Sequence, residues 1–330
     1  MHADSLTYDS IDDCLGPAEQ RYFGTGYRRV RHRLEDIRID GAARLVRADG
    51  GLDYPTDWST KSPGSTLVPH LSTIDTVLFG MQLAEVLMVA ALRLDADQRR
   101  RSWLRGYAVK AGSQPTERLE SFPVEARLTG TEPVARSLGD VVSTVDCLVG
   151  TLRLRLEIEH EAGGGGESAA ARYASVDDVL GPAAQRLYGT RHVERRHEIL
   201  GVRSAPEWTA GTVRTADADE SATDGISAAY GSALSALDCL IVFAQMSQVL
   251  MYAQDGISRE RTGTLWLREM TVRSRTPYQP TELPFGVRGE CRRTSLVRIG
   301  DDTWHTGRLA GGMQSTSSTA TLAFRLLDAA

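Results

Sequence analysis

Two stretches of the chain combine a helix-start signal with apolar residues on every side. Each begins with the pattern LSxxD, first at Leu71–Met88 and again at Leu234–Met251. The serine suits the N-cap of a helix, and the aspartate three residues later suits the N3 position of a capping box. Gly256 follows the second stretch, and glycine commonly ends a helix. We therefore expect two long helices that are buried on most faces.

The segments around these helices alternate as strands do. The clearest is Leu152–Glu159, where Leu and Ile alternate with Arg and Glu, as in a strand with one buried and one wet face. Weaker strand patterns cover Tyr27–Ile39, Trp103–Lys110 and Thr264–Arg273. Each part of the chain thus has a strand or hairpin, one long buried helix, and then several antiparallel strands. One helix wrapped by a curved antiparallel sheet is the hot-dog arrangement, so the predicted fold is an α+β, tandem-duplicated (double) hot-dog.

The chain repeats part of itself. Twelve of eighteen positions are identical between Tyr8–Thr25 and Tyr173–Thr190, at an offset of 165. The two helix stretches share seven of eighteen positions at an offset of 163. Copies of this length indicate two similarly folded halves, because solenoid repeats have periods of about 20–50 residues.

A run of four glycines, Gly163–Gly166, lies between the copies and predicts a flexible linker. We place the first half at 1–160, the linker at 161–169 and the second half at 170–330.

Composition narrows the class of protein. An apolar fraction of 41% is ordinary for a chain with a core, and a net charge of −5 is unlike that of a nucleic-acid binder. The four cysteines show no CxxC spacing, and we expect no metal site. We find no signal peptide, and polar residues interrupt the apolar stretches before they reach a membrane span. We expect a cytoplasmic protein without nucleic-acid or membrane partners, and a homodimer is compatible with the sequence.

Arginines cluster at related places in the two copies. The clusters favour either an exposed strand face or a dock for the phosphates of coenzyme A or for an acidic carrier protein. They comprise Arg28, Arg29, Arg31, Arg33, Arg191, Arg195 and Arg196.

The repeated segments IDDCLGPAEQRYFGTGYRRV and VDDVLGPAAQRLYGTRHVERR resemble the avirulence D (AvrD) family, most specifically in the LGPAxQRxxG core at Leu15–Gly24. The resemblance implies the biosynthesis of syringolide-type signals, in which a β-ketoacyl chain is joined to a ketopentose, with a logic similar to that of γ-butyrolactone synthases. It implies an enzyme that takes an acyl group from acyl-CoA or an acyl carrier protein to a small polyol or sugar, without a metal or redox cofactor. A hot-dog dehydratase, hydratase or thioesterase is the near alternative, and a non-catalytic acyl-ligand-binding or scaffold protein is the alternative of another class.

Asp75 and Asp238 are the first candidate site residues. The segment Pro69–Asp75 also resembles the HPxLLD opening of the central helix in polyketide synthase dehydratases, in which the aspartate is catalytic. The separate HxxxGxxxxP signature of those enzymes is not apparent. Each aspartate is therefore either a general acid/base at the mouth of an acyl tunnel or a helix cap.

Three histidines are candidates for the residue that carries a proton during a reaction. His70 precedes the first helix, and the second copy has Ala233 there. His70 is either a structural residue or the proton shuttle of one working site, with the second site decayed. His32 and His197 match at offset 165 and are the competing choice, with a polar strand face as the alternative role.

Two further helix positions are candidates for substrate contact. Gln82 and Gln245 match in mid-helix, where a buried amide needs a partner: a substrate hydroxyl or carbonyl, or else a sheet carbonyl or the other half. Gly80 is matched by Phe243. We expect either an open cavity beside the first helix and a plugged one beside the second, or a glycine that only admits a bulky side chain from the facing sheet.

Overall fold

The computed structural model describes residues 5–61, 67–134, 139–164, 169–216, 222–256, 259, 262, 264–299 and 302–326. Part of the predicted linker, residues 165–168, therefore lies outside the described residues. The helices and 3-10 turns are α1 (Ile11–Leu15), η1 (Ala18–Gln20), η2 (Gly26–Arg29), α2 (Thr73–Leu92), α3 (Ala96–Arg101), α4 (Asp177–Leu180), η3 (Ala183–Gln185), η4 (Arg191–Val193), η5 (Ala228–Tyr230) and α5 (Ala236–Asp255).

The strands are β1 (Leu6–Ser10), β2 (Arg31–Asp40), β3 (Leu45–Asp53), β4 (Trp103–Lys110), β5 (Phe122–Pro133), β6 (Val141–Val149), β7 (Leu152–His160), β8 (Ala171–Ser175), β9 (Arg196–Ala205), β10 (Trp208–Ala216), β11 (Trp266–Ser274), β12 (Phe285–Ile299), β13 (Asp302–Met313) and β14 (Thr316–Arg325). Within the strand predicted at Tyr27–Ile39, the first residues form η2 instead, because the chain turns there before β2 begins.

The two long helices begin as their sequences predict. At the start of α2 the Ser72 hydroxyl accepts the Asp75 N–H (3.2 Å), and the Asp75 carboxylate accepts the Ser72 N–H (2.9 Å). The same capping box opens α5, between Ser235 and Asp238. Gly256 then ends α5 with a φ of +61°, in the left-handed region that favours glycine. The capping predictions are confirmed.

Both helices are core elements. Every residue of α2 from Ile74 to Met88 is buried. Each long helix is apolar and long enough to cross a membrane by those criteria alone, yet 83% and 78% of the two windows are buried inside the protein. Burial against the sheet accounts for their apolar character.

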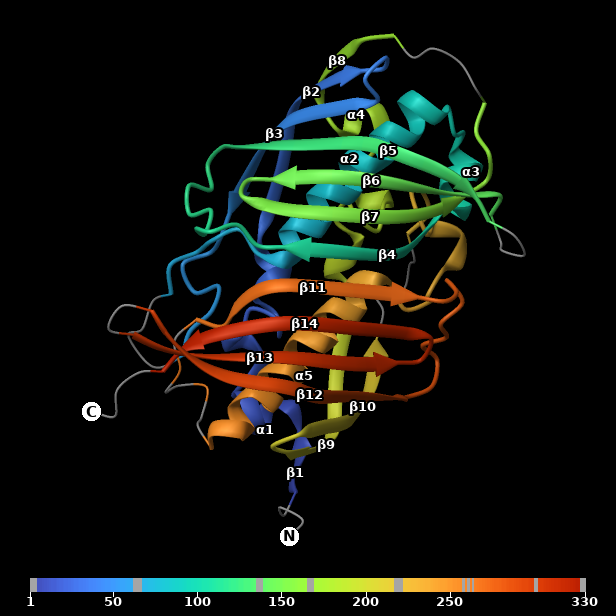
Figure 1. Cartoon of the computed structure of the whole chain (residues 1–330). Coiled ribbons are helices and arrows are strands. Elements are labelled where there is room, and N and C mark those ends of the chain that lie inside the picture. Colours follow the sequence, from blue (N-terminus) through green and yellow to red (C-terminus); the bar gives the residue numbers. More distant parts are fainter. Residues whose placement is uncertain are drawn as a thin grey trace.

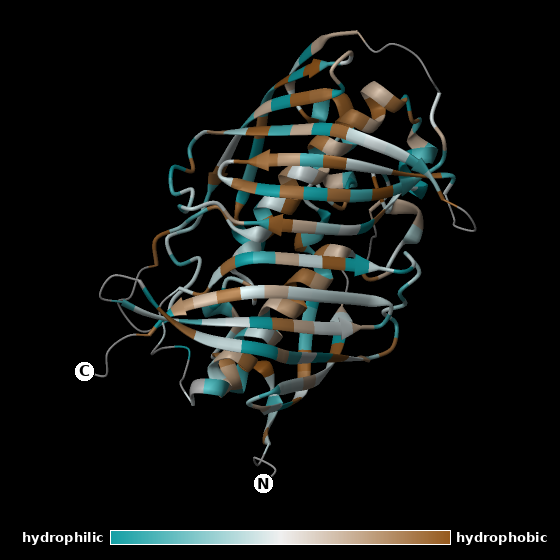
Figure 2. Ribbon diagram, in the orientation of Figure 1, coloured by the Kyte–Doolittle hydropathy of each residue, from teal (hydrophilic) through white to brown (hydrophobic). Residues whose placement is uncertain are grey.

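The fourteen strands of the described residues form one sheet in the order β1-β9-β10-β12-β13-β14-β11-β4-β7-β6-β5-β3-β2-β8. The strands pair antiparallel throughout, and the halves join where β11 pairs with β4. Counted outward from that seam, each half repeats the same order of six strands and lies over one long helix, α2 in the upper half and α5 in the lower half (Figure 1). Brown and teal residues alternate along many strands, as expected when one face covers a helix and the other is wet (Figure 2). The fold is therefore α+β, with a large antiparallel sheet and few helices.

The first strand of each copy is exchanged between the halves. β1 pairs with β9 of the second half, and β8 pairs with β2 of the first half (Figure 1). The short helices follow their strands, so that α1 packs against α5 and α4 packs against α2. Residues 6–15 and 171–180 thus complete the half to which they do not belong in sequence. The boundaries predicted at 160 and 170 separate the repeats, and the packed units interleave across them.

Candidate functional site

A cavity of about 810 Å³ opens at the beginning of α2 and runs along α5 and strands β11, β13 and β14. Its volume lies in the range of sites that bind small molecules. The residues around the N-terminus of α2 form one wall, and one face of α5 forms another. Residues that define these two walls are Leu71, Ser72, Thr73, Leu240, Ala244 and Gln248. The cavity therefore lies between the two halves. The beginning of α2 in the first half and the helix α5 and sheet of the second half form its walls.

A second pocket, of about 70 Å³, occupies the equivalent place at the beginning of α5. Its residues Leu234, Ser235 and Ala236 match Leu71, Ser72 and Thr73 of the large cavity at an offset of 163. The strand opposite is matched too, because Trp103 and Leu104 correspond to Trp266 and Leu267. The duplication has thus produced two related sites, of which one is much larger.

Buried side chains fill the space in the first half that the cavity occupies in the second. The positions of α2 that correspond to Ala244 and Gln248 hold Met81 and Glu85, and both are buried. Glu85 accepts a hydrogen bond from Arg99 at 2.8 Å. Burial raises the pKa of Glu85, and the charge of Arg99 opposes that shift. An ion pair and a methionine therefore replace the alanine and glutamine that border the open cavity.

Gly80 does not border this cavity, and the expected cavity beside the first helix is wrong in position. A Cβ on Gly80 would lie 2.2 Å from Cδ2 of Leu154 on β7. The glycine thus admits a bulky side chain from the facing sheet, which was the alternative reading. Phe243, its match on α5, packs against Gly311 and does not line the large cavity.

Gly80→Phe is consequently expected to prevent folding rather than to block acyl binding, because no space exists for the ring beside Leu154. Circular dichroism and urea unfolding of the purified variant measure this directly. Ala244→Trp, whose side chain enters the cavity, should fold and serves as the control. A folded Gly80→Phe protein that had lost only acyl binding would contradict this packing.

His70 borders the large cavity and is held by aromatic rings. Its ring centroid lies 4.8 Å from that of Trp266 and 5.8 Å from that of Trp58. Its Nδ1 is 3.1 Å from the carbonyl oxygen of Val68. A carbonyl only accepts, so Nδ1 carries the proton of the neutral ring, and Nε2 is the basic nitrogen. The arrangement supplies an imidazole base at the cavity wall.

Asp75 is fully buried and does not touch the cavity. Its carboxylate accepts hydrogen bonds from His32 Nε2 (2.7 Å), the Ser72 N–H (2.9 Å) and the Tyr54 hydroxyl. The Tyr22 hydroxyl is 3.4 Å from the same carboxylate and 2.5 Å from the Ser72 hydroxyl. Tyr22 and Ser72 border the cavity. Among the described residues, Tyr22 and Ser72 thus connect Asp75 with the cavity.

The charge states of this cluster follow from its burial. Burial alone would raise the pKa of Asp75, but the hydrogen bond and charge of His32, with Tyr54 and Ser72, outweigh it and lower the pKa. Burial, and then the charge of Asp75, raise the pKa of Tyr22 and Tyr54 well above the ordinary value. Asp75 is thus a carboxylate and both tyrosines are neutral hydrogen-bond donors at neutral pH.

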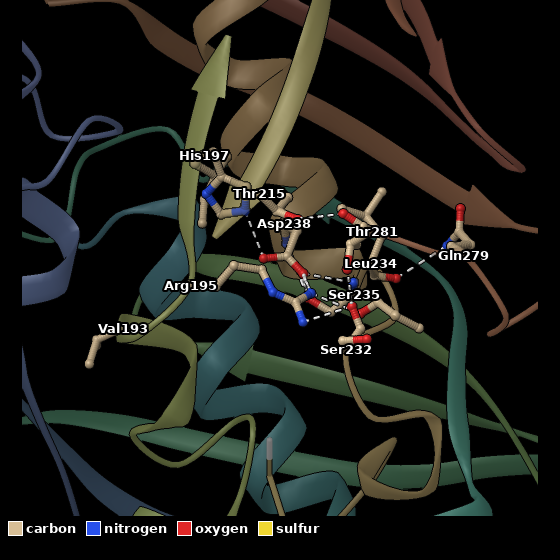
Figure 3. A network of polar contacts seen from close by, with 12 residues as sticks. Val193, Arg195, His197, Thr215, Ser232, Leu234, Ser235, Asp238, Gln279 and Thr281 are labelled. Carbon is tan, nitrogen blue, oxygen red and sulfur yellow. Dashed lines mark hydrogen bonds and ion pairs between the residues drawn. The ribbon is translucent and has the colours of Figure 1, made fainter. Parts of the chain in front are cut away.

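Asp238 is the centre of a different network in the second half (Figure 3). It accepts from His197 Nε2 and from Arg195, both at 2.8 Å, and from the Ser235 N–H at 2.7 Å. Arg195 also donates to the carbonyl oxygens of Ala233 and Ser232. Burial would raise the pKa of Asp238, but the positive charge of Arg195, with His197 and Ser235, lowers it. This carboxylate is locked into an ion pair.

Comparison of the two networks shows how the copies diverged. Val30 occupies the position of Arg195, and Tyr22 occupies the position of Leu187, at an offset of 165. The pairs His32–Asp75 and His197–Asp238 are nevertheless the same in both halves. The first site has tyrosine hydroxyls in place of the Arg195 ion pair, and one of these tyrosines, Tyr22, borders the large cavity.

The two glutamines take part in helix packing, and neither borders the large cavity. The Gln82 side chain is 3.4 Å from the Leu78 carbonyl oxygen of its own helix, and it is buried. Gln245 accepts a hydrogen bond of 2.6 Å from Arg21, which follows the exchanged helix α1. Gln245 thus ties the exchanged segment to α5.

His192 was not among the candidate residues, although it lies close to the first site. Its ring centroid is 6.1 Å from that of His32, and its side chain is buried. Neither ring nitrogen has a hydrogen-bond partner among the described residues. Burial, and then the charge of His32, lower the pKa of His192 to about 3. The ring of His192 is therefore neutral at neutral pH.

This neutral histidine should make the protein sensitive to acid. Between pH 6.5 and about 3 the unfolded chain binds a proton at His192 that the folded protein does not, so stability falls as the pH falls through this range. His192→Phe should reduce the loss of unfolding free energy between pH 7 and pH 5 by about 2 kcal/mol. Urea unfolding at both pH values tests this. Equal losses in the variant and the parent would rule out His192 as the acid-sensitive group.

Metal-binding residues do not gather in the described part of the chain. No group of three His, Cys, Asp or Glu side chains there lies close enough to hold a metal ion. The site that the structure does assemble consists of an imidazole, two hydroxyls and the beginning of a helix.

Comparison with known proteins identifies a family that the chain matches. A model of the family described as Pseudomonas avirulence D protein (AvrD) matches residues 6–327, which is nearly the whole chain. No curated protein matches the sequence.

Several solved structures share a similar course of the chain at low identity. They include an acyl-CoA thioesterase II, TesB2, from Mycobacterium marinum (9% identity, 87% of this chain and 94% of that chain, TM-score 0.36). A conserved protein of unknown function with a hot-dog fold from Alicyclobacillus acidocaldarius gives 10% identity over 89% and 96% of the two chains, with a TM-score of 0.37. The dehydratase GphF dehydratase 1 gives 15% identity over 90% and 100%, with a TM-score of 0.38.

Proposed function

The chain belongs to the avirulence D (AvrD) family, and from this premise we propose that it transfers a β-ketoacyl group from a thioester to a hydroxyl of a small polyhydroxy acceptor. The donor is acyl-CoA or an acyl carrier protein, and the compartment is the cytoplasm. We describe each half, with its long helix under a curved antiparallel sheet, as one hot-dog unit of a double hot-dog. The observation that carries the proposal is the large cavity at the beginning of α2, with His70 on its wall.

The beginning of α2 suits a thioester carbonyl. Thr73 is the first residue of the helix and borders the cavity. Within the described residues, its N–H has no hydrogen-bond acceptor. An N–H group at the positive end of a helix stabilises an oxygen on which negative charge develops. The acyl chain then extends along the apolar face of α5.

His70 suits the acceptor hydroxyl. In the proposed reaction, Nε2 of His70 takes the hydroxyl proton while the hydroxyl oxygen bonds to the thioester carbon. The carbonyl oxygen becomes an oxyanion near the N–H of Thr73. When that intermediate collapses, the carbon–sulfur bond breaks and the departing thiolate takes the proton from His70. The products are an ester and a thiol.

Asp75 has a positioning role in this proposal. With His32 and Tyr54 it fixes the start of α2, and it orients the hydroxyls of Tyr22 and Ser72 that border the cavity. Asp238 and His197 hold α5 in the same way, beside a pocket of only about 70 Å³. The buried position of Asp75 also weakens the dehydratase alternative, because there the aspartate must meet the substrate.

Parallel incubations separate the candidate functions. A β-ketoacyl thioester, as the CoA and as the carrier-protein form, is mixed with a ketopentose, and products are followed by mass spectrometry with a thiol assay. An acylated sugar and an equal amount of thiol are expected. Thiol with free acid would indicate a thioesterase. A 3-hydroxyacyl thioester and a 2-enoyl thioester are supplied in parallel: loss of water from the first would indicate a dehydratase, and gain of water by the second would indicate a hydratase. Binding of the thioester without any product would indicate the non-catalytic alternative.

A further inference from the structure

Lysine is rare in this chain. Of its 38 basic residues, 36 are arginine, and the lysines are Lys61 and Lys110. Lys110 ends β4 and is exposed to solvent. Lys61 lies after Thr60, on the wall of the large cavity. Arginine cannot lose its proton in a protein, whereas the amine of lysine can become a neutral nucleophile. Almost every other positive side chain of this protein is an arginine, so the amine of Lys61 at the cavity wall is a candidate for a reacting group.

The surroundings of Lys61 favour the neutral amine. Burial, and then the nearby charge of Arg259, lower the pKa of Lys61 to about 7. Arg259 is itself buried and borders the same cavity. The Lys61 Nζ donates to the carbonyl oxygen and to the hydroxyl of Thr262, at 2.8 and 2.9 Å. These hydrogen bonds anchor the amine of a residue that lines the large cavity. The amine of Lys61 therefore gives up its proton more readily than that of an ordinary lysine.

We propose that Lys61 forms a covalent imine with a ketone carbonyl of the substrate in the large cavity. The inference rests on the proposed function, which supplies two ketones: the 3-oxo group of the acyl chain and the carbonyl of a ketopentose. Both present the same chemistry to the amine. The large cavity is open to such a molecule, and the pocket at α5 is not.

The step balances without a further reactant. The amine nitrogen bonds to the ketone carbon, and the carbonyl oxygen leaves as water with the two hydrogens of the amine. His70, on the wall of the same cavity, is suited to carry the proton between nitrogen and oxygen. No electron is gained or lost overall. Protonation of the imine gives an iminium ion, which acidifies the carbon between the imine and the thioester and so prepares it to form a carbon–carbon bond.

Reductive trapping tests the proposal. The intact protein is incubated separately with the N-acetylcysteamine thioester of 3-oxodecanoate and with a ketopentose, each with sodium cyanoborohydride, and is analysed by intact mass and peptide mapping. A stable adduct on Lys61 is expected with at least one probe, and the two arms show which ketone reacts. The decanoyl thioester, which has no ketone, should give none.

Two variants keep the result interpretable. Lys61→Arg retains a positive charge and should lose the adduct, whereas Lys110→Arg should keep it. Absence of an adduct from both arms, or an adduct confined to Lys110 or the N-terminus, overturns the imine. The acyl-transfer assay is read separately. Transfer without an adduct leaves the proposed function standing and removes the imine, whereas a Lys61 adduct without transfer supports the imine and counts against acyl transfer.

Discussion

Replacing His70 with asparagine is expected to lower kcat for acyl transfer by about 10²–10⁴-fold, the usual contribution of a general base. The asparagine amide can still donate to the Val68 carbonyl oxygen, as Nδ1 of the histidine does. It places no basic nitrogen where Nε2 lies. Because His70 is only partly buried, the free energy of unfolding should change little. Steady-state kinetics and urea unfolding of the same preparation measure the two effects.

The duplication supplies the matched control for this experiment. Ala233 is the equivalent position at the small pocket, so Ala233→His adds an imidazole where no large cavity exists. It should leave the rate of the parent unchanged and should not rescue His70→Asn. A His70→Asn protein that retains the parental kcat would show that the base is another group.

Ala244→Trp is expected to weaken binding of a ten-carbon acyl thioester by about 200-fold. Ala244 lies on the α5 face that borders the cavity and is partly exposed to it. An indole there would displace about four methylene groups of the chain, and about 0.8 kcal/mol for each makes roughly 3 kcal/mol. A two-carbon acyl group does not reach this part of the cavity and should bind as before. Isothermal titration with non-hydrolysable thioether analogues of both lengths measures the difference.

Phe243→Leu is the control, because Phe243 is buried on α5 away from the large cavity. This variant should lose stability but keep the parental dependence on chain length. Equal weakening of short and long analogues by Ala244→Trp would mean that the acyl chain lies elsewhere.

The sequence predicted those features of the fold that depend on residues close together in the chain. The capping box and the apolar residues of α2 and α5 act within one or two helix turns, so each helix could be placed from its own letters. The exchange of β1 and β8 could not be predicted in this way. Their repeat identity marks them as equivalent, but it does not say which half each one joins.

The site shows the same limit. His70 stood out because the second copy lacks it, and the same comparison would have marked Tyr22, which Leu187 replaces. Gly80 misled because the mismatch with Phe243 reports on Leu154 of a distant strand and not on a ligand. Lys61 was visible only in composition, as one of two lysines, and no spacing pattern contains it.

The exchange of β1 also delays folding during synthesis, because its partner strand is made much later. Leu6 pairs with Ser204, so β1 leaves the ribosome about 200 residues before its partner exists. At about 5–20 residues per second, this wait is about 10–40 s. The first half can form its helix and most of its sheet during that time, but it lacks β8 until translation has passed residue 175. Completion of either half therefore depends on the other, and native structure should become resistant to protease late and in both halves together.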